Sequence, residues 1–215
     1  GGTPSAVAAA LTDKHALGTH TEMLGNAMIN LIRSGAVTNR RKTLHPGKTV
    51  CAFFLGDEDA VDFLENTPDV MFRPAAYTNH PATIARNENM VSVNTTLQVD
   101  LLGQVSSESI GSRQYSGTGG AMDFAYGAHN APNGRSIIAV NATAKGGSLS
   151  RISAALPVGS AVSIPRNIVD YVVTEFGIAR LRNCSVRQRV ENLIAVAHPD
   201  FRAELAREAQ KLLLW

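Results

Sequence analysis

The sequence predicts an α/β fold with an open, largely parallel sheet and flanking helices. Short apolar runs that end at glycine or polar residues alternate with segments that have the apolar spacing of helices. With 215 residues, of which 44% are hydrophobic, the chain can bury a core as one large domain or two small ones. Alternating strands and helices indicate a parallel sheet, because parallel neighbours need a crossover connection.

Two helices are expected first. The Thr-Pro pair at residues 3–4 has the pattern of an N-cap followed by proline, and this helix is expected to end near Gly18. The second is expected to begin at Thr21 and to end at Gly35, where glycine can adopt a left-handed C-terminal cap. Its apolar residues, at helical spacing, are Met23, Leu24, Met28, Leu31 and Ile32. Glu22 would therefore lie in the first turn of a helix.

The rest of the chain continues the alternation. Residues 50–55 form a continuous apolar run, as expected of a strand buried on both faces. Residues 57–66 look helical, and two helices are expected between about 185 and 213. The other strand candidates are 69–73, 90–94, 97–102, 136–141, 160–164 and 170–174. The segment 103–147 is rich in Gly, Ser and Asn, a composition that lets a backbone approach a ligand.

Charge and cysteine content argue against several classes of function. The net charge is +2 with mixed signs along the chain, so neither a nucleic-acid partner nor a membrane partner is expected. Cys51 and Cys184 lie far apart, and the histidines lack HxxxH or HxH spacing, so no disulfide scaffold and no metal site are predicted. No apolar run reaches the ~18 residues of a membrane span. We expect a cytoplasmic protein, or one of the mitochondrial matrix in a eukaryote, and a fragment, since the chain opens at Gly1.

Glu22 is the first candidate for chemistry, and its spacing supports two interpretations. Thr19-x-x-Glu22 matches a capping box, in which the glutamate satisfies a backbone N–H at a helix start. A carboxylate at a helix opening can also point into a cleft and attack an activated carbonyl. Glu175 follows an apolar strand and is the rival nucleophile, or else a structural glutamate. Spacing leaves these alternatives open.

A glycine-rich segment is the second candidate. Ser116-Gly117-Thr118-Gly119-Gly120 offers successive backbone N–H groups ahead of a helix expected near Met122, and such a turn can hold a phosphate or an oxyanion. It can equally be a tight loop, and it matches neither GxGxxG nor a Walker A sequence. Lys145 and Arg151 could meet the phosphates of a nucleotide-like ligand, or remain solvated surface cations.

Several segments, taken together and in this order, carry a family resemblance. They are Gly18-x-His20-Thr21-Glu22-Met23, Gly35-x-Val37-Thr38-Asn39, His45-Pro46-Gly47-Lys48, Tyr77-Thr78-Asn79-His80-Pro81, Val99-Asp100-Leu101-x-Gly103-Gln104-Val105, Ser116-Gly117-x-Gly119-Gly120, Tyr171-Val172-Val173-Thr174-Glu175-x-Gly177-Ile178-Ala179 and Ala197-His198-Pro199-Asp200-Phe201-Arg202. The chain, from about residue 3 to 208, resembles the C-terminal half of acetyl-CoA hydrolases and of the 4-hydroxybutyrate, butyrate and succinate:acetate CoA-transferases.

The resemblance implies the fold and the domain organisation. Members carry two similar open α/β domains of the NagB/RpiA/CoA-transferase type. Residues 1–215 would be the C-terminal catalytic domain, with residues 1–20 in the inter-domain region. The N-terminal domain of the same protein would then be missing and would be one of its partners, and a homo-oligomer is expected.

The resemblance also implies site residues. Glu22 would be the nucleophile, with Gly119 or Gly120 as the oxyanion donor. Asn79 would face the bound acyl-CoA, and Gly117 and Lys145 would contact the CoA.

The activity implied is transfer of CoA between an acyl-CoA and a small carboxylate, through an acyl-glutamyl anhydride and a glutamyl-CoA thioester on Glu22. Coenzyme A would be a substrate, and no permanently bound cofactor is expected. The alternatives are an acyl-CoA hydrolase that uses the same glutamate and a non-catalytic α/β module that binds a phosphate or sugar phosphate. Many relatives have Gln where Ala121 stands and Asp-Gly at residues 26–27, so the acyl preference stays open.

Overall fold

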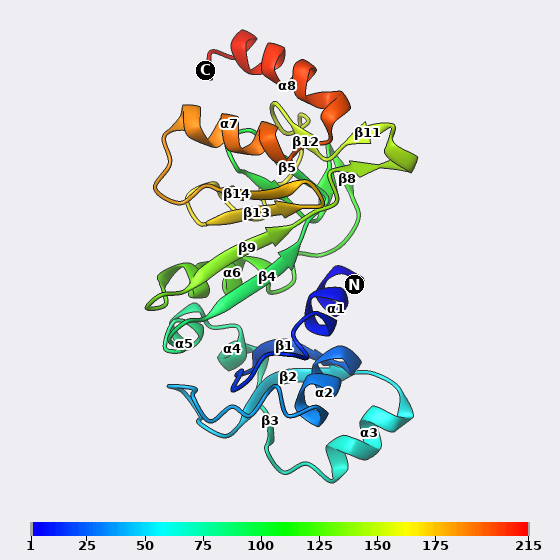
Figure 1. Ribbon diagram of the computed structural model, residues 1–215, viewed down its shortest axis with the longest axis vertical. Helices are drawn as coiled ribbons and strands as arrows, with labels where there is room; N and C mark the ends of the chain where they lie inside the picture. The colour runs from blue at the N-terminus through cyan, green and yellow to red at the C-terminus, as the bar shows by residue number, and fades with distance from the viewer. Residues whose placement is uncertain (1, 215) are drawn as a thin grey trace. The chain divides into compact units, whose positions relative to one another are not determined.

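A computed structural model describes residues 2–214 of the chain (Figure 1). The chain divides into two compact units. The first unit consists of residues 1–90 and 130–134, and the second of residues 91–129 and 135–215. Both units combine parallel strand pairs with helices, which confirms the predicted α/β class.

The first unit is built on a three-stranded parallel sheet. Its strands, in spatial order, are β1 (His20–Gly25), β2 (Thr49–Leu55) and β3 (Val70–Phe72). Its helices are α1 (Gly2–Ala9), α2 (Asn26–Arg33), α3 (Glu58–Glu65), α4 (Ala75–Thr78) and α5 (Pro81–Ile84). One buried cluster joins the sheet to α2 and α3 through Leu24, Ile29, Cys51 and Ala60. The helix predicted at 57–66 and the strand predicted at 69–73 are confirmed.

The prediction of a helix beginning at Thr21 was wrong. Residues 20–25 form β1, and the helix begins only at Asn26. The reason is tertiary: β1 pairs with β2, whose partner residues lie thirty positions away, and a short apolar segment does not show by itself which structure it will join. Gly35 adopts the predicted left-handed conformation, with φ of 78°.

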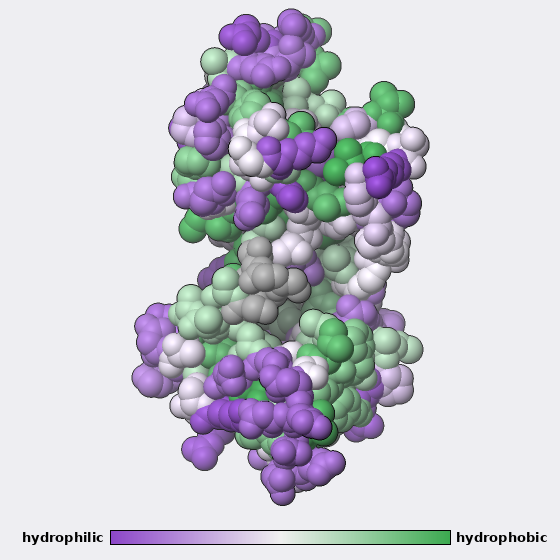
Figure 2. Space-filling view, turned by 90° about the vertical axis from the view of Figure 1, so that its right-hand side faces the viewer, coloured by the Kyte–Doolittle hydropathy of each residue, from purple (hydrophilic) through white to green (hydrophobic). Residues whose placement is uncertain are grey.

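Two other expectations for this unit need correction. The first helix ends at Ala9 and not near Gly18. β2 was predicted to be buried on both faces, but Phe53 and Leu55 are 47% and 67% exposed. Met23, which pairs with Phe53, is also exposed. The first unit therefore presents an apolar part of its sheet at the surface, and Figure 2 shows apolar surface gathered on this part of the chain.

The second unit holds the larger sheet, with the spatial order β14-β13-β9-β4. The strands β4 (Val91–Thr95), β9 (Arg135–Ala139) and β13 (Tyr171–Thr174) are parallel, and β14 (Gly177–Arg180) pairs antiparallel at the edge. A smaller sheet contains β12 (Ile152–Ser153), β5 (Gln98–Asp100) and β6 (Val105–Ser106). Two hairpins are formed by β7 (Ser109–Ile110) with β8 (Arg113–Gln114), and by β10 (Thr143–Ala144) with β11 (Leu149–Ser150). The helices are α6 (Ala121–Asn130), α7 (Val186–Val196) and α8 (Pro199–Lys211).

Most predicted elements of the second unit are confirmed, among them the strands near 90–94, 97–102, 136–141 and 170–174 and the two final helices. The strand at 160–164 was wrong, because only an isolated bridge between Ile164 and Val105 forms there. The edge strand β14 was not predicted. Within residues 2–214, no helix is long and apolar enough to cross a membrane.

The second unit also buries a carboxylate. Asp170 has no solvent exposure, and its oxygens accept hydrogen bonds from Nδ1 of His129 at 2.7 Å and from the backbone N–H of Ser136 at 2.9 Å. The guanidinium of Arg182 lies 3.4 Å away. These bonds tie α6 and β9 to the start of β13. Removing one partner of a buried ionic group lowers the free energy of unfolding, because the remaining groups stay buried without their hydrogen bonds.

We therefore expect Asp170→Ala to lower the free energy of unfolding by about 3 kcal/mol, as measured by urea denaturation. Glu204→Ala is the control, because it removes an exposed carboxylate of the same unit. Asp170→Asn should lose less stability than Asp170→Ala, since an amide oxygen can still accept a hydrogen bond from the backbone N–H of Ser136. Equal stability of the Asp170→Ala and Glu204→Ala proteins would contradict this role.

Candidate active site

Glu22 lies in the middle of β1 and is partly buried. Its Oε1 accepts a hydrogen bond of 2.9 Å from Nδ2 of Asn79, the residue that caps the C-terminus of α4. No hydrogen bond to Oε2 occurs among the described residues. Fifty-seven positions separate the two residues in the chain. The structure thus brings together two of the predicted site residues, the carboxylate and the asparagine, and leaves one carboxylate oxygen without a donor from residues 2–214.

The amide of Asn79 is oriented by its neighbour. The hydroxyl of Thr78, a fully buried residue, lies 3.2 Å from Oδ1 of Asn79 and 3.3 Å from the backbone oxygen of Pro74, so it can donate to either. A donor beside Oδ1 favours the amide orientation that turns Nδ2 toward Glu22. Thr78 therefore stabilises the amide orientation in which Asn79 donates to the carboxylate of Glu22.

His20 holds the same segment in place. Its Nε2 lies 2.8 Å from the backbone oxygen of Thr78, and since a carbonyl only accepts, Nε2 carries the proton. Burial lowers the pKa of His20, the bond to Thr78 opposes this, and the charges of Lys42 and His45 lower it further. The net lowering keeps the imidazole neutral at neutral pH. The hydrogen bond between His20 and Thr78 and the one between Asn79 and Glu22 therefore tie β1 to the end of α4.

The residue before β1 is fixed as well. Asn39 accepts from the backbone N–H of Thr19 at 2.8 Å and donates to the hydroxyl of Thr49 at 2.8 Å. The ammonium of Lys42 donates to the backbone oxygens of Thr19 and Lys48, both at 2.7 Å. Burial lowers the pKa of Lys42 to about 8. Both backbone polar groups of Thr19 are thus bonded to side chains from the segment that leads to β2.

These contacts overturn the capping-box interpretation. The N–H of Thr19 is bonded to Asn39 and the carboxylate of Glu22 to Asn79, and no helix begins here. Sequence reasoning also missed the roles of Asn39 and Lys42. The signal was present, because Asn39 closes one of the segments that carry the family resemblance, but its side-chain partners were not readable from the sequence.

The glycine-rich segment lies in the second unit. Residues 117–119 are exposed, Gly120 is buried, and α6 begins at Ala121, as predicted for a helix near Met122. Gly119 has φ of 56°, which favours glycine. Among the residues that the structure describes, no acceptor is bonded to the N–H of Gly119 or Gly120. The segment keeps two backbone donors available beside the N-terminus of a helix.

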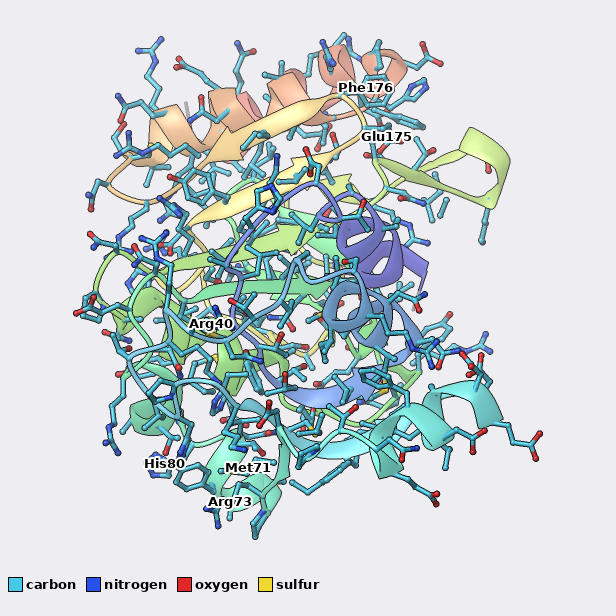
Figure 3. All side chains as sticks on the ribbon, turned by 60° about the horizontal axis from the view of Figure 1, so that its bottom comes forward. Arg40, Met71, Arg73, His80, Glu175 and Phe176 are labelled. Atoms are coloured by element: carbon cyan, nitrogen blue, oxygen red, sulfur yellow. The ribbon has the colours of Figure 1, made fainter. Side chains whose placement is uncertain are left out.

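The remaining candidates of the second unit lie in turns. Lys145 begins a 3₁₀ turn (Lys145–Gly147) between β10 and β11 and is exposed. Glu175 lies in the tight turn between β13 and β14, where Figure 3 labels it beside Phe176. Its Oε2 accepts from the backbone N–H of Ala142 at 2.8 Å. This bond ties the turn between β13 and β14 to the segment that follows β9, which gives Glu175 a structural role. Over residues 2–214, no cluster of three or more His, Cys, Asp or Glu is arranged to hold a metal ion.

Comparison with known proteins finds relatives that are named as CoA transferases. Succinyl-CoA:cyclohexane-1-carboxylate CoA transferase of Geobacter metallireducens is 49% identical over 99% of this chain and 48% of its own length. The structure of RipA from Yersinia pestis has a TM-score of 0.93 at 44% identity, covering all of this chain and 48% of that one. The 4-hydroxybutyrate CoA-transferase from Porphyromonas gingivalis has a TM-score of 0.86 at 42% identity, covering 99% of this chain and 50% of that one.

The chain thus spans about half the length of the curated relatives that it matches. The model of the acetyl-CoA hydrolase/transferase C-terminal domain matches residues 56–209. Glu22 lies before this range, in a part of the chain that the pairwise alignments also cover. A match of this extent, together with the α/β fold shared with CoA-transferase structures, shows that the chain belongs to the acetyl-CoA hydrolase/transferase family, in the region of its C-terminal domain.

Proposed function

We propose that this chain carries the nucleophile of a CoA-transferase that moves CoA between an acyl-CoA and a small carboxylate, with Glu22 as that nucleophile. The observation that carries the proposal is the bond between Glu22 and Asn79, which fixes one carboxylate oxygen and leaves the other without a partner in the part of the chain that the structure describes. The relatives named as CoA-transferases support the same class of reaction.

The reaction begins with attack of Oε2 of Glu22 on the thioester carbonyl of the donor. The tetrahedral adduct collapses, the carbon–sulfur bond breaks, and CoA leaves as a thiolate, which gives an acyl-glutamyl anhydride. The thiolate then attacks the glutamyl carbonyl carbon and releases the donor carboxylate, which leaves a glutamyl-CoA thioester.

The second half of the reaction reverses these steps with the acceptor carboxylate in place of the donor's. The acceptor carboxylate attacks the glutamyl-CoA thioester and expels the thiolate, which forms a new anhydride. The thiolate attacks the acceptor's carbonyl carbon in that anhydride, and a new acyl-CoA leaves while Glu22 returns to its carboxylate form. Because each step exchanges one activated carbonyl for another, the free energy of the thioester is preserved.

Backbone and side-chain donors would stabilise the charge that develops in these steps. In the proposal, the N–H groups of Gly119 and Gly120 meet the oxyanion of the substrate thioester. The amide of Asn79 meets the oxygen of the glutamyl group, while Gly117 and Lys145 contact the CoA. Coenzyme A takes part as a substrate, and the protein supplies no further cofactor. The remaining half of the protein and a second copy of it complete the proposed enzyme.

Exclusion of water separates transfer from hydrolysis in this scheme. Water that reaches the anhydride or the glutamyl thioester would release free acid, and the same Glu22 would then serve an acyl-CoA hydrolase. Release of acid in the absence of an acceptor carboxylate would identify that alternative. A binding module would show neither reaction.

We expect Glu22→Ala in the complete protein to lower the rate of acyl-CoA exchange by at least ~10³-fold, because the covalent route is lost. Glu65→Ala, which removes an exposed carboxylate from the end of α3, is the matched control. Initial rates with a carboxylate acceptor measure the effect. Retained exchange in Glu22→Ala together with its loss in Glu175→Ala would assign the nucleophile to Glu175.

Asn79→Ala should lower kcat by about 10²-fold and change KM less, since a donor to the reacting carboxyl group is lost while the substrate contacts elsewhere remain. Asn66→Ala is the control, because this amide is exposed and donates to the backbone oxygen of Asp62, away from Glu22. Asn79→Asp should be worse than Asn79→Ala, as it places a second carboxylate beside Glu22. Equal rates in the Asn79 and Asn66 variants would remove Asn79 from the site.

The covalent intermediate can be trapped directly. Complete protein incubated with acyl-CoA and no acceptor should accumulate the glutamyl-CoA thioester, and borohydride should reduce it to an alcohol at Glu22. Peptide mass mapping should place the change in residues 18–23, with activity lost in proportion. An unmodified Glu22 combined with intersecting double-reciprocal plots would refute the covalent route.

A further inference from the structure

A pocket of about 450 Å³ lies against α4 and α5, within the first unit. Tyr77, His80, Thr83 and Arg86 are among the residues that line it. Residues 77–80 contribute to both features, the pocket and the environment of Glu22. Thr78 and Asn79 bond to β1, whereas Tyr77 and His80 line the pocket. It is therefore a feature additional to the environment of Glu22.

The polar groups that line this pocket are hydrogen-bond donors. Nδ1 of His80 accepts from the backbone N–H of Ala82 at 3.2 Å, so the proton of the neutral ring is on Nε2. Arg86 contributes a guanidinium and Thr83 a hydroxyl. Among the described residues that line the pocket, none is acidic.

Further positive charge lies close to Tyr77, one of the lining residues. The guanidinium of Arg73 lies 5.9 Å from the ring centroid of Tyr77, whose hydroxyl is 2.7 Å from Nε2 of His45. Figure 3 labels Arg73 and His80 near each other at one end of this unit. Burial lowers the pKa of His45, and the charges of Lys42, Arg73 and Arg86 lower it further. All three positive charges therefore act on the imidazole of His45.

Within residues 2–214, no salt bridge joins Arg73 or Arg86 to a carboxylate. Arg33 and Lys48 of the same unit, by contrast, pair with Asp59 and Asp69. Like charges gathered without compensation repel one another, and a bound anion offsets that repulsion. Arginine with its planar donors suits phosphate oxygens in particular.

We propose that this pocket binds the phosphate of a phosphoester. The volume exceeds what a phosphate alone needs, and Pro74, Ala76 and Ala82 add apolar lining, so the ligand carries an organic group next to its phosphate. Two sources supply this chemistry: the phosphorylated nucleotide end of CoA, which rests on the proposed function, or a free phosphorylated metabolite that binds independently of the reaction.

Titration calorimetry of the complete protein at low salt tests the site with three probes. These are adenosine 3′,5′-bisphosphate, glycerol 3-phosphate and adenosine. We expect both phosphoesters to bind and adenosine to bind at least ~10-fold more weakly than the bisphosphate. Tighter binding of the bisphosphate than of glycerol 3-phosphate, with displacement by CoA, assigns the site to CoA. Equal binding of the two phosphoesters assigns it to a free phosphorylated metabolite.

The variants separate this site from general charge effects. Arg73→Gln and Arg86→Gln should each weaken binding of the bisphosphate about 10-fold. Arg86→Lys should weaken it less, because the positive charge is kept. Arg33→Gln removes the same charge from a paired arginine and should leave the affinity unchanged. Glu22→Ala should also leave it unchanged, so failure of the catalytic proposal does not affect this test. Binding of adenosine as tight as that of the phosphoesters, no binding of either phosphoester, or equal losses in the Arg33 and Arg86 variants would overturn the site.

Discussion

The candidate site depends on the parallel pairing of β1 with β2. Side chains of a strand alternate between its two faces, so His20 and Glu22 project to the same side, and both bond to the end of α4. Were these residues helical, they would lie on different sides of the helix and could not share this neighbour. The strand conformation of six residues thus places the carboxylate, its amide donor and the histidine that anchors that donor.

The hydrogen bonds around Glu22 are unevenly distributed. The backbone of Thr19, the carbonyl of Thr78 and the amide of Asn79 all have protein partners, whereas Oε2 of Glu22 has none among the described residues. Polar groups with partners hold their positions, and Oε2 is the carboxylate oxygen that the proposed chemistry uses. A rigid surrounding with one open oxygen is what a nucleophile requires, because attack needs a fixed geometry without a competing donor.

Other parts of the family resemblance have a structural explanation. Asp100 is buried and accepts hydrogen bonds from the backbone of Leu102 and from both the backbone and the side chain of Gln104, which closes the turn between β5 and β6. Gly103 lies in the same turn with φ of 89°, and a Cβ there would meet the side chain of Leu181 at 2.8 Å. These residues stabilise the turn between β5 and β6, so a shared motif can preserve a turn as well as a site.

The sequence by itself predicted the α/β class, most strands, the last two helices and the family, because these follow from apolar spacing, glycine positions and the order of short segments. Asn79 was named as a site residue from the resemblance alone, whereas Glu22 was already a candidate from its place near a predicted helix start, and the resemblance then favoured it as the nucleophile. Only the tertiary structure revealed that Glu22 lies on a strand, that Asn79 bonds to it, and that Asn39 and Lys42 hold the residue before that strand. The pocket beside α4 likewise needed coordinates. The physical reason is that these contacts join residues twenty to almost sixty positions apart, and local spacing carries no information about which distant segment supplies a partner.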